Sequence, residues 1–201
     1  DPLIELHENL TELFSDKLGE TLTSVDIVDI ENLIGRCVVS GNVRRSAALA
    51  LGEADDFRYL EMKNDQEKLY HHRWGSNNSF NAQVGMDYTW HAEQSQKNGE
   101  PGYIWLENAR AFGRMKDGAN YDDAEVVGFN PCVEQSLHNA EMCCLVETFP
   151  AKHDDYEDYV KTLKCAYLYG KTVTLVNTHW PETNAKMLKN RRIGLSQSGI
   201  V

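Results

Sequence analysis

The chain has 201 residues, and its 31 acidic residues outnumber its 20 Lys and Arg residues, which gives a formal net charge of −11. This balance argues against a protein that coats nucleic acid, because phosphate binding needs a basic face. No apolar run approaches the roughly 18 residues of a membrane span, and no secretory signal pattern is present. Five cysteines without a repeating spacing do not make a disulfide framework, so we expect free thiols in a reducing compartment, the cytoplasm.

The first half of the chain carries apolar patterns of both helical and strand type. Leucines at helical spacing predict a helix over residues 1–18, and a second apolar stripe starts at Ile27 and turns β-like at residues 37–39. Residues 44–51 fit a strand or a buried helix, since a short apolar run has no decisive period. A helix-prone stretch, a strand and a helix that ends at a breaker cluster are predicted at 57–70, 77–84 and 86–97.

The second half alternates strands and helices more regularly. After a loop at residues 116–120, an amphipathic pattern predicts a helix over 154–169 that is closed by Gly170. A β-branched strand at 172–176, a helix at 181–190 and a strand at 193–200 complete the pattern. Strand and helix alternation of this kind predicts an α/β fold.

The segment of residues 130–145 (NPCVEQSLHNAEMCCL) holds the residues best suited to chemistry. Pro131 biases Asn130 towards an extended backbone, which places Cys132 in a loop. Glu134 follows two residues later, and Cys143 lies 11 residues after Cys132, far enough for the chain to leave the loop and return beside it. An amide, a carboxylate and two thiols together would equip a site for redox chemistry and proton transfer.

Simpler interpretations of these cysteines remain open. A free cysteine is often a small buried hydrophobe, and Cys165 lies near the apolar face of the predicted 154–169 helix, where we expect it in the core. Cys143 and Cys144 beside His138 suggest a metal site, but adjacent residues of a strand point to opposite faces and the chain has no C-x-x-C. We therefore expect no metal site.

Five motifs in order resemble the ribonucleotide reductases, and within them the adenosylcobalamin-dependent (class II) enzymes that act on ribonucleoside triphosphates. The first is NPCVE at 130–134, followed after 11 residues by Cys143, as in the active-site finger loop of the family. The others are at residues 40–47 (SGNVRRSA), 73–79 (RWGSNNS), 99–102 (GEPG) and 191–194 (RRIG).

This resemblance implies a role for each residue of the NPCVE segment. Cys132 matches the cysteine that becomes a thiyl radical and abstracts the 3′ hydrogen of the ribose. Glu134 matches the carboxylate that takes the 3′-OH proton, and Asn130 matches the amide that hydrogen-bonds the ribose hydroxyls. Cys143 matches one of two thiols that supply electrons and end as a disulfide. Many members have Gly in place of Val133.

Three further assignments follow from the same comparison. Many members have Asn in place of Cys144, but the 11-residue spacing favours Cys143 as the redox thiol. Cys37 lies too close in sequence to be its partner, so we expect Cys37 to be structural and the partner to lie before residue 1. Candidate substrate-binding residues are Asn77, Asn78, Ser79 and Arg44.

These substrate-binding assignments have structural alternatives. Asn77, Asn78 and Ser79 fit either a pocket at a strand end or a polar turn. Arg44 and its neighbour Arg45 fit either phosphate contacts or a pair that holds a strand against acidic neighbours. His71 and His72 are expected on a solvated surface rather than as ligands.

For the whole protein, the resemblance implies a ten-stranded α/β barrel with the radical cysteine on a central finger loop. Residues 1–201 would form part of this catalytic domain, as a fragment truncated at both ends and inactive in isolation. The resemblance further implies reduction of ribonucleoside triphosphates to deoxyribonucleotides for DNA synthesis. Adenosylcobalamin would bind beyond residue 201, dNTPs would act as effectors, and a thioredoxin-type protein would be the reductant.

Two other functions are compatible with the sequence. One is the large subunit of a metal-cofactor (class I) ribonucleotide reductase, which shares the finger loop and receives its radical from a second subunit. The other is a non-catalytic nucleotide-binding α/β domain in which NPCVE is an ordinary turn. Sequence beyond residue 201 would separate the first, and thiol titration would separate the second.

Overall fold

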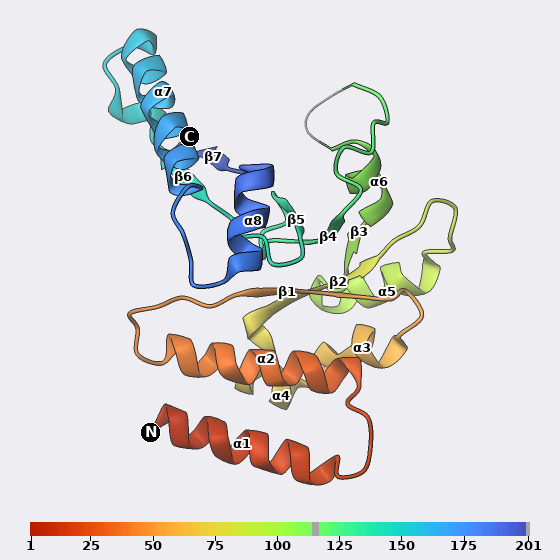
Figure 1. Cartoon of the computed structure of the whole chain (residues 1–201). Coiled ribbons are helices and arrows are strands. Elements are labelled where there is room, and N and C mark those ends of the chain that lie inside the picture. The colour runs from red at the N-terminus through yellow and green to blue at the C-terminus, as the bar shows by residue number, and fades with distance from the viewer. Residues whose placement is uncertain (114–116, 200–201) are drawn as a thin grey trace. The chain divides into compact units, whose positions relative to one another are not determined.

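The structure is a computed structural model that describes residues 1–113 and 117–199. The chain divides into two compact units, unit 1 from Asp1 to Asp123 and unit 2 from Ala124 to Val201. The helices and strands of unit 1 are α1 (Pro2–Asp16), α2 (Ser24–Val39), β1 (Ala48–Gly52), α3 (Phe57–Glu61), η1 (Met62–Asn64), α4 (Gln66–His71), η2 (Arg73–Gly75), β2 (Ser76–Asn81), α5 (Thr89–Asn98), β3 (Gly102–Ile104) and α6 (Leu106–Ala111) (Figure 1).

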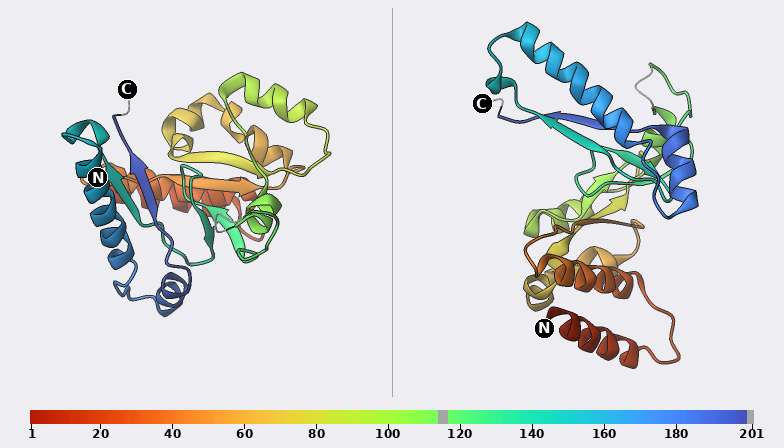
Figure 2. Two further views of the ribbon diagram at one scale, coloured as in Figure 1. Left: turned by 90° about the horizontal axis from the view of Figure 1, so that it is seen from above. Right: turned by 60° about the vertical axis from the view of Figure 1, so that its left-hand side comes forward.

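The first two helices lie side by side and antiparallel (Figures 1 and 2). The predicted N-terminal helix is confirmed as α1, whose Asp1 side chain accepts a hydrogen bond from the first turn. Thr23 and Asp26 form a capping box at the start of α2. This helix runs on to Val39, so the β-like interpretation of residues 37–39 is wrong. Nothing interrupts the helix at Gly35, where a Cβ would lie 3.1 Å from the Ser46 hydroxyl, so the glycine serves close packing rather than a chain break.

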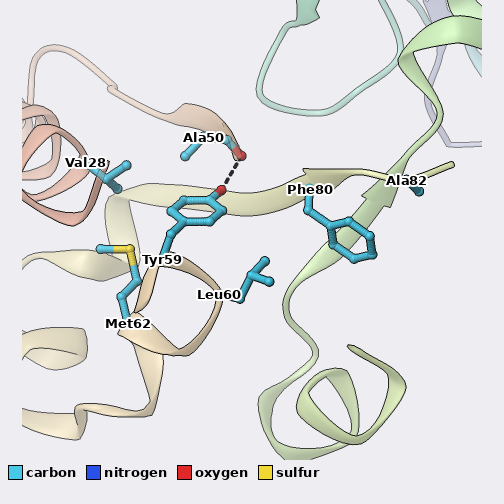
Figure 3. Close-up of a cluster of buried hydrophobic side chains, with 7 residues drawn as sticks. All are labelled: Val28, Ala50, Tyr59, Leu60, Met62, Phe80 and Ala82. Atoms are coloured by element: carbon cyan, nitrogen blue, oxygen red, sulfur yellow. Dashed lines mark hydrogen bonds between the residues drawn. The ribbon is translucent and has the colours of Figure 1, made fainter. Parts of the chain in front are cut away.

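A three-stranded parallel sheet of order β1–β2–β3 forms the centre of unit 1. Residues 44–51 therefore contribute a strand, and residues 77–84 contain one. The core between this sheet and the helices is drawn in Figure 3 and contains Val28, Ala50, Tyr59, Leu60, Met62, Phe80 and Ala82. The Tyr59 hydroxyl lies 2.7 Å from the carbonyl oxygen of Ala50, and an added Cβ at Gly52 would lie 2.4 Å from the Tyr59 ring. Close backbone approach thus requires glycine at position 52.

A buried ion cluster joins α2 to η2. The Arg73 side chain donates to both carboxylate oxygens of Asp29, at 2.6 and 2.7 Å, and His72 Nε2 lies 2.9 Å from the same carboxylate. Burial alone would raise the pKa of Asp29, but the hydrogen bonds from Arg73 and His72 outweigh it and hold this pKa at about 2. The expectation of a solvated surface is wrong for His72, which is 6% exposed, because Asp29 supplies a buried partner that the sequence separation hides.

Unit 2 contains an antiparallel pair, β4 (Val126–Phe129) and β5 (Ser136–His138), and a parallel pair, β6 (Leu145–Thr148) and β7 (Gly194–Gln197). Between β6 and β7 the chain forms η3 (Pro150–Lys152), α7 (Tyr156–Val173) and α8 (Pro181–Asn190). Figure 2 shows β6 and β7 side by side, with α7 packed along them.

The prediction that Gly170 closes the long helix of unit 2 is wrong. This glycine lies inside α7, where a Cβ would meet Val146 at 3.1 Å and Ile193 at 3.5 Å, so its small size lets the helix approach β6 and β7. The helix continues to Val173, and the predicted strand at 172–176 is therefore wrong. The predicted helix at 181–190 is confirmed, and the strand expected at 193–200 covers Gly194–Gln197 within the described residues.

The fold is α/β, as the alternation predicted. The described residues form one three-stranded sheet and two two-stranded sheets, and they do not make a complete ten-stranded barrel. Residues 117–120 of the predicted surface loop lack regular structure, whereas Lys116 lies outside the described residues. Among the described residues, no helix combines the length and apolar character that crossing a membrane demands.

Candidate functional site

The NPCVE segment forms the connection of the β4–β5 hairpin. The backbone of Asn130 donates to the Gln135 carbonyl at 3.1 Å, and Val133 N–H donates to the Asn130 carbonyl at 2.9 Å. Asn130 also uses its side chain, because its Oδ1 accepts from Gln135 N–H at 2.9 Å. These three bonds fix the turn that presents Cys132, and the predicted loop position of Cys132 is confirmed.

The Asn130 amide joins two of the predicted site residues. Its Nδ2 donates to Glu134 Oε1 at 2.5 Å and lies 3.6 Å from Cys143 Sγ. Because Oδ1 is held by Gln135 N–H, the donor end of the amide is the end that faces the carboxylate and the thiol. Asn130 is 5% exposed, whereas Glu134 is exposed, so the amide lies below the surface and the carboxylate reaches solvent.

The tip of the turn combines an exposed thiol with unusual backbone. Cys132 is exposed, and Val133 has a φ of 69°, in the left-handed region that favours glycine. A β-branched residue in this conformation carries backbone strain of about 1–3 kcal/mol, which the hydrogen bonds of the turn offset. The position where many of the resembling reductases carry Gly is therefore one where the backbone itself favours Gly.

Burial distinguishes the two neighbouring thiols of the site. Cys143 is half-buried, and burial, the Glu134 carboxylate and the adjacent Cys144 raise the pKa of its thiol, while the Asn130 hydrogen bond opposes that rise. Cys144 is buried, and burial raises the pKa of its thiol as well. The two side chains thus differ in exposure, and among the thiols at 143 and 144 it is Cys143 that contacts Asn130.

The candidate substrate-binding residues belong to unit 1. Asn77, Asn78 and Ser79 form part of β2 rather than a polar turn; Asn77 is exposed, and the other two are buried. Arg44 is exposed in the segment that leads into β1, and neither it nor Arg45 forms an ion pair with the described residues, so the acidic neighbours expected for a structural pair are not found there. Their contact with substrate stays a prediction.

The two remaining cysteines, Cys37 and Cys165, lie on helices outside the NPCVE hairpin. Cys37 is half-buried in α2, and its structural role stays a prediction. Cys165 is exposed on α7, so the expectation that it lies in the core is wrong; the buried position of that turn is taken by Ala166. Within residues 1–113 and 117–199, no group of three or more His, Cys, Asp or Glu side chains has the arrangement of a metal site.

The sequence did not predict the buried ion pair between Glu141 and Arg192 in this region. The Glu141 side chain is 0% exposed and pairs with Arg192, whose Nε lies 3.0 Å from each carboxylate oxygen. Two features of the sequence could have indicated this pair: a single carboxylate in the apolar stretch AEMCCL, and the arginines of the RRIG motif.

Curated relatives cover the chain almost completely. It is 50% identical over 201 residues to the adenosylcobalamin-dependent ribonucleoside-triphosphate reductase of Euglena gracilis and 49% identical over 203 residues to a protein described as a probable enzyme of the same kind from Dictyostelium discoideum. Identity to the Lactobacillus leichmannii reductase is 45% over 206 residues. The chain is homologous to a segment of these reductases. It covers only 27–28% of their length.

A solved structure supports the same relationship. The chain matches the crystal structure of a B12-dependent (class II) ribonucleotide reductase with a TM-score of 0.85 and 43% identity, over 99% of this chain and 28% of the other. No family model matches the sequence. The resemblance inferred from the five motifs is therefore confirmed, while the roles of individual residues stay predictions.

Proposed function

We propose that the chain supplies the thiol and carboxylate part of the active site of an adenosylcobalamin-dependent ribonucleoside-triphosphate reductase. The observation that carries this proposal is the Asn130 amide, which donates to Glu134 and lies against Cys143 on the hairpin that exposes Cys132. A radical reduction of ribose uses a radical cysteine, a carboxylate, an orienting amide and a pair of reducing thiols, and this chain offers all of these except the second reducing thiol. The relatives named above carry this activity in their names.

Each residue then has a distinct task. Cys132, as a thiyl radical, takes the 3′ hydrogen atom of the ribose, and Glu134 accepts the 3′-OH proton while the 2′-OH leaves as water. Glu134 is suited to a base because it reaches solvent and is oriented by Asn130. Cys143 and a second thiol supply two electrons and two protons and end as a disulfide, so the net change is one ribonucleotide and two thiols to one deoxyribonucleotide, one disulfide and one water.

Cys132 is the residue on which the cofactor would act. Adenosylcobalamin, when bound, would supply the radical that removes the hydrogen atom of the Cys132 thiol. The exposed position of this thiol on a hairpin turn fits that role, because a thiol sealed in the core would be inaccessible. We assign none of the described residues to holding the cofactor. The finger-loop location inside a ten-stranded barrel is part of the same proposal.

The reductant, the effectors and the compartment are proposed on the same basis. A thioredoxin-type dithiol would reduce the disulfide of Cys143 and its partner by thiol–disulfide exchange. Effector dNTPs would act elsewhere in the protein. All five cysteines of the chain carry free thiols, which fits a reducing compartment such as the cytoplasm.

The test is the Cys132→Ser variant of the full-length protein that carries this sequence. It is assayed with a ribonucleoside triphosphate, adenosylcobalamin and a dithiol, and the deoxyribonucleotide product is separated by chromatography. We expect product to be abolished while nucleotide binding is spared. Cys165→Ser, which removes an exposed thiol from α7, is the matched control and should retain activity. Substantial reduction by Cys132→Ser would contradict the assignment of the radical site.

A further inference from the structure

Three successive contacts tie the segment that carries Cys143 to residues 187–194, which run from α8 to the first residue of β7. Arg192 pairs with Glu141, Met142 N–H points to the sulfur of Met187 at 3.4 Å, and Gly194 N–H donates to the Cys144 carbonyl at 2.8 Å. Residues 141, 142 and 144 are therefore each held from the same segment. The Cys143 side chain between them instead contacts Asn130.

The Arg192–Glu141 pair is the strongest of these anchors. Its carboxylate is fully buried, the Arg192 side chain is 12% exposed, and both oxygens lie 3.0 Å from the same Nε. Glu141 Oε2 also accepts from His138 N–H at 2.8 Å, at the end of β5. One carboxylate thereby joins the β4–β5 hairpin, the thiol segment and the start of β7. Removing one partner of a buried pair leaves an uncompensated charge, so the link is costly to break.

The neighbours of Arg192 in the RRIG motif hold this anchor in place. The Arg191 side chain donates to Thr174 Oγ1 at 2.5 Å and to the Lys171 carbonyl at 2.7 Å, at the end of α7. A Cβ on Gly194 would lie 2.3 Å from the end of the Leu145 side chain and 3.2 Å from that of Gln135, so β6 and the hairpin approach this glycine closely. The motif thus binds α7 on one side and the thiol segment on the other.

We propose that Arg192 is a positioning residue that, through Glu141, sets the place of the Cys143 thiol against the Asn130 amide. The inference rests on the proposed function in so far as Cys143 acts as a redox thiol. The effect of Arg192 on the exposure and reactivity of the Cys143 thiol can be measured without turnover. Burial is the largest cause of the raised pKa of Cys143, so loosening the segment exposes the thiol and lowers its pKa. The loss of the Asn130 hydrogen bond acts in the opposite direction and is the smaller effect.

The experiment measures the alkylation rate of each cysteine by iodoacetamide in the full-length protein between pH 7 and 10, resolved by peptide mass spectrometry. For Arg192→Ala we expect Cys143 to react about three- to tenfold faster at pH 8, with its pH profile displaced downward. Arg192→Lys should restore part of the protection, because it keeps the charge. Lys189→Ala removes from α8 an exposed cation that pairs with Glu125, and it should leave the Cys143 alkylation rate unchanged.

Other cysteines separate positioning from unfolding. Cys37, in unit 1, and the buried Cys144 should keep their wild-type rates in Arg192→Ala. An equal rise at Cys37, Cys144 and Cys143 would show a merely structural role and overturn the proposal, as would an unchanged rate at Cys143. Where Arg192→Ala does not fold, Glu141→Gln removes the charge with little change of shape and should give the same selective rise.

A double-mutant cycle gives the second criterion. If Arg192 acts through Glu141, the Arg192→Ala change should add little to the Cys143 rate in a Glu141→Gln background. Fully additive effects would overturn the proposal. Because alkylation needs neither substrate nor cofactor, these results stand apart from the Cys132→Ser assay, and either proposal can fail without the other.

Discussion

The buried Asp29–Arg73 pair allows a quantitative prediction for unit 1. Replacing Asp29 with Asn keeps the size of the side chain and removes its charge, which leaves the Arg73 guanidinium, 4% exposed, without its counter-charge. Breaking a buried pair in this way costs about 3–5 kcal/mol. We expect Asp29→Asn to lower the free energy of unfolding of unit 1 by that amount at pH 7.

The same residue sets a pH dependence with a definite sign. The pKa of Asp29 is about 2 in the folded state, against an ordinary 3.8, so the unfolded state binds more protons between these values. Stability therefore falls progressively as pH drops from about 5 to 1, most steeply between pH 4 and 2, and the whole loss amounts to about 2.5 kcal/mol. This part of the acid sensitivity should be absent in Asp29→Asn.

A urea titration read out by pulsed hydrogen exchange and peptide mass spectrometry would measure both effects, since it reports unit 1 and unit 2 separately. Glu31→Gln, an exposed position on the same helix, is the matched control and should stay within about 0.5 kcal/mol of the wild type. A loss below 1 kcal/mol in Asp29→Asn at pH 7, or an undiminished fall in stability between pH 4 and 2, would refute this reasoning.

Three further substitutions test local packing and backbone. Gly52→Ala places a Cβ 2.4 Å from the Tyr59 ring and should cost about 1–3 kcal/mol, seen as a lower Tm; an unchanged Tm would contradict the close approach. Val133→Gly should stabilise unit 2 by about 0.5–1 kcal/mol in urea unfolding, because its φ of 69° suits glycine, and a loss of stability would count against the strain. Asn130→Leu removes the hydrogen bond that lowers the pKa of Cys143, so alkylation of Cys143 at pH 8 should slow; a faster reaction would oppose this account.

Much of the fold was predictable because local signals and tertiary structure agree. Asp1 caps α1, and Pro2 and Pro181 stand at the first position of α1 and α8, where proline is favoured, so these preferences coincide with the observed boundaries. The loop position of Cys132 follows from Pro131, and the return of the chain to place Cys143 beside Asn130 follows the 11-residue spacing. These features depend on residues close in sequence.

The predictions are wrong where a residue far away in the sequence determines the role or burial of a side chain. Gly170 looks like a helix end, but its partners Val146 and Ile193 make it a packing residue inside α7. His72 looks like surface because its partner Asp29 lies 43 residues away. Burial of an individual side chain depends on which face of a helix the rest of the fold covers, and the local period does not reveal that.

The anchoring of Glu141 by Arg192 also has a consequence for synthesis on the ribosome. The two residues lie 51 positions apart, and β6 pairs with β7 only after α7 and α8 have crossed between them. Parallel pairing across such a distance is slow, because the connecting chain must be ordered before the contacts form. Until residue 194 has emerged, the nascent chain therefore lacks the contacts that hold residues 141–144 to residues 187–194, and in that interval Cys143 and Cys144 are more open to oxidation than in the finished packing.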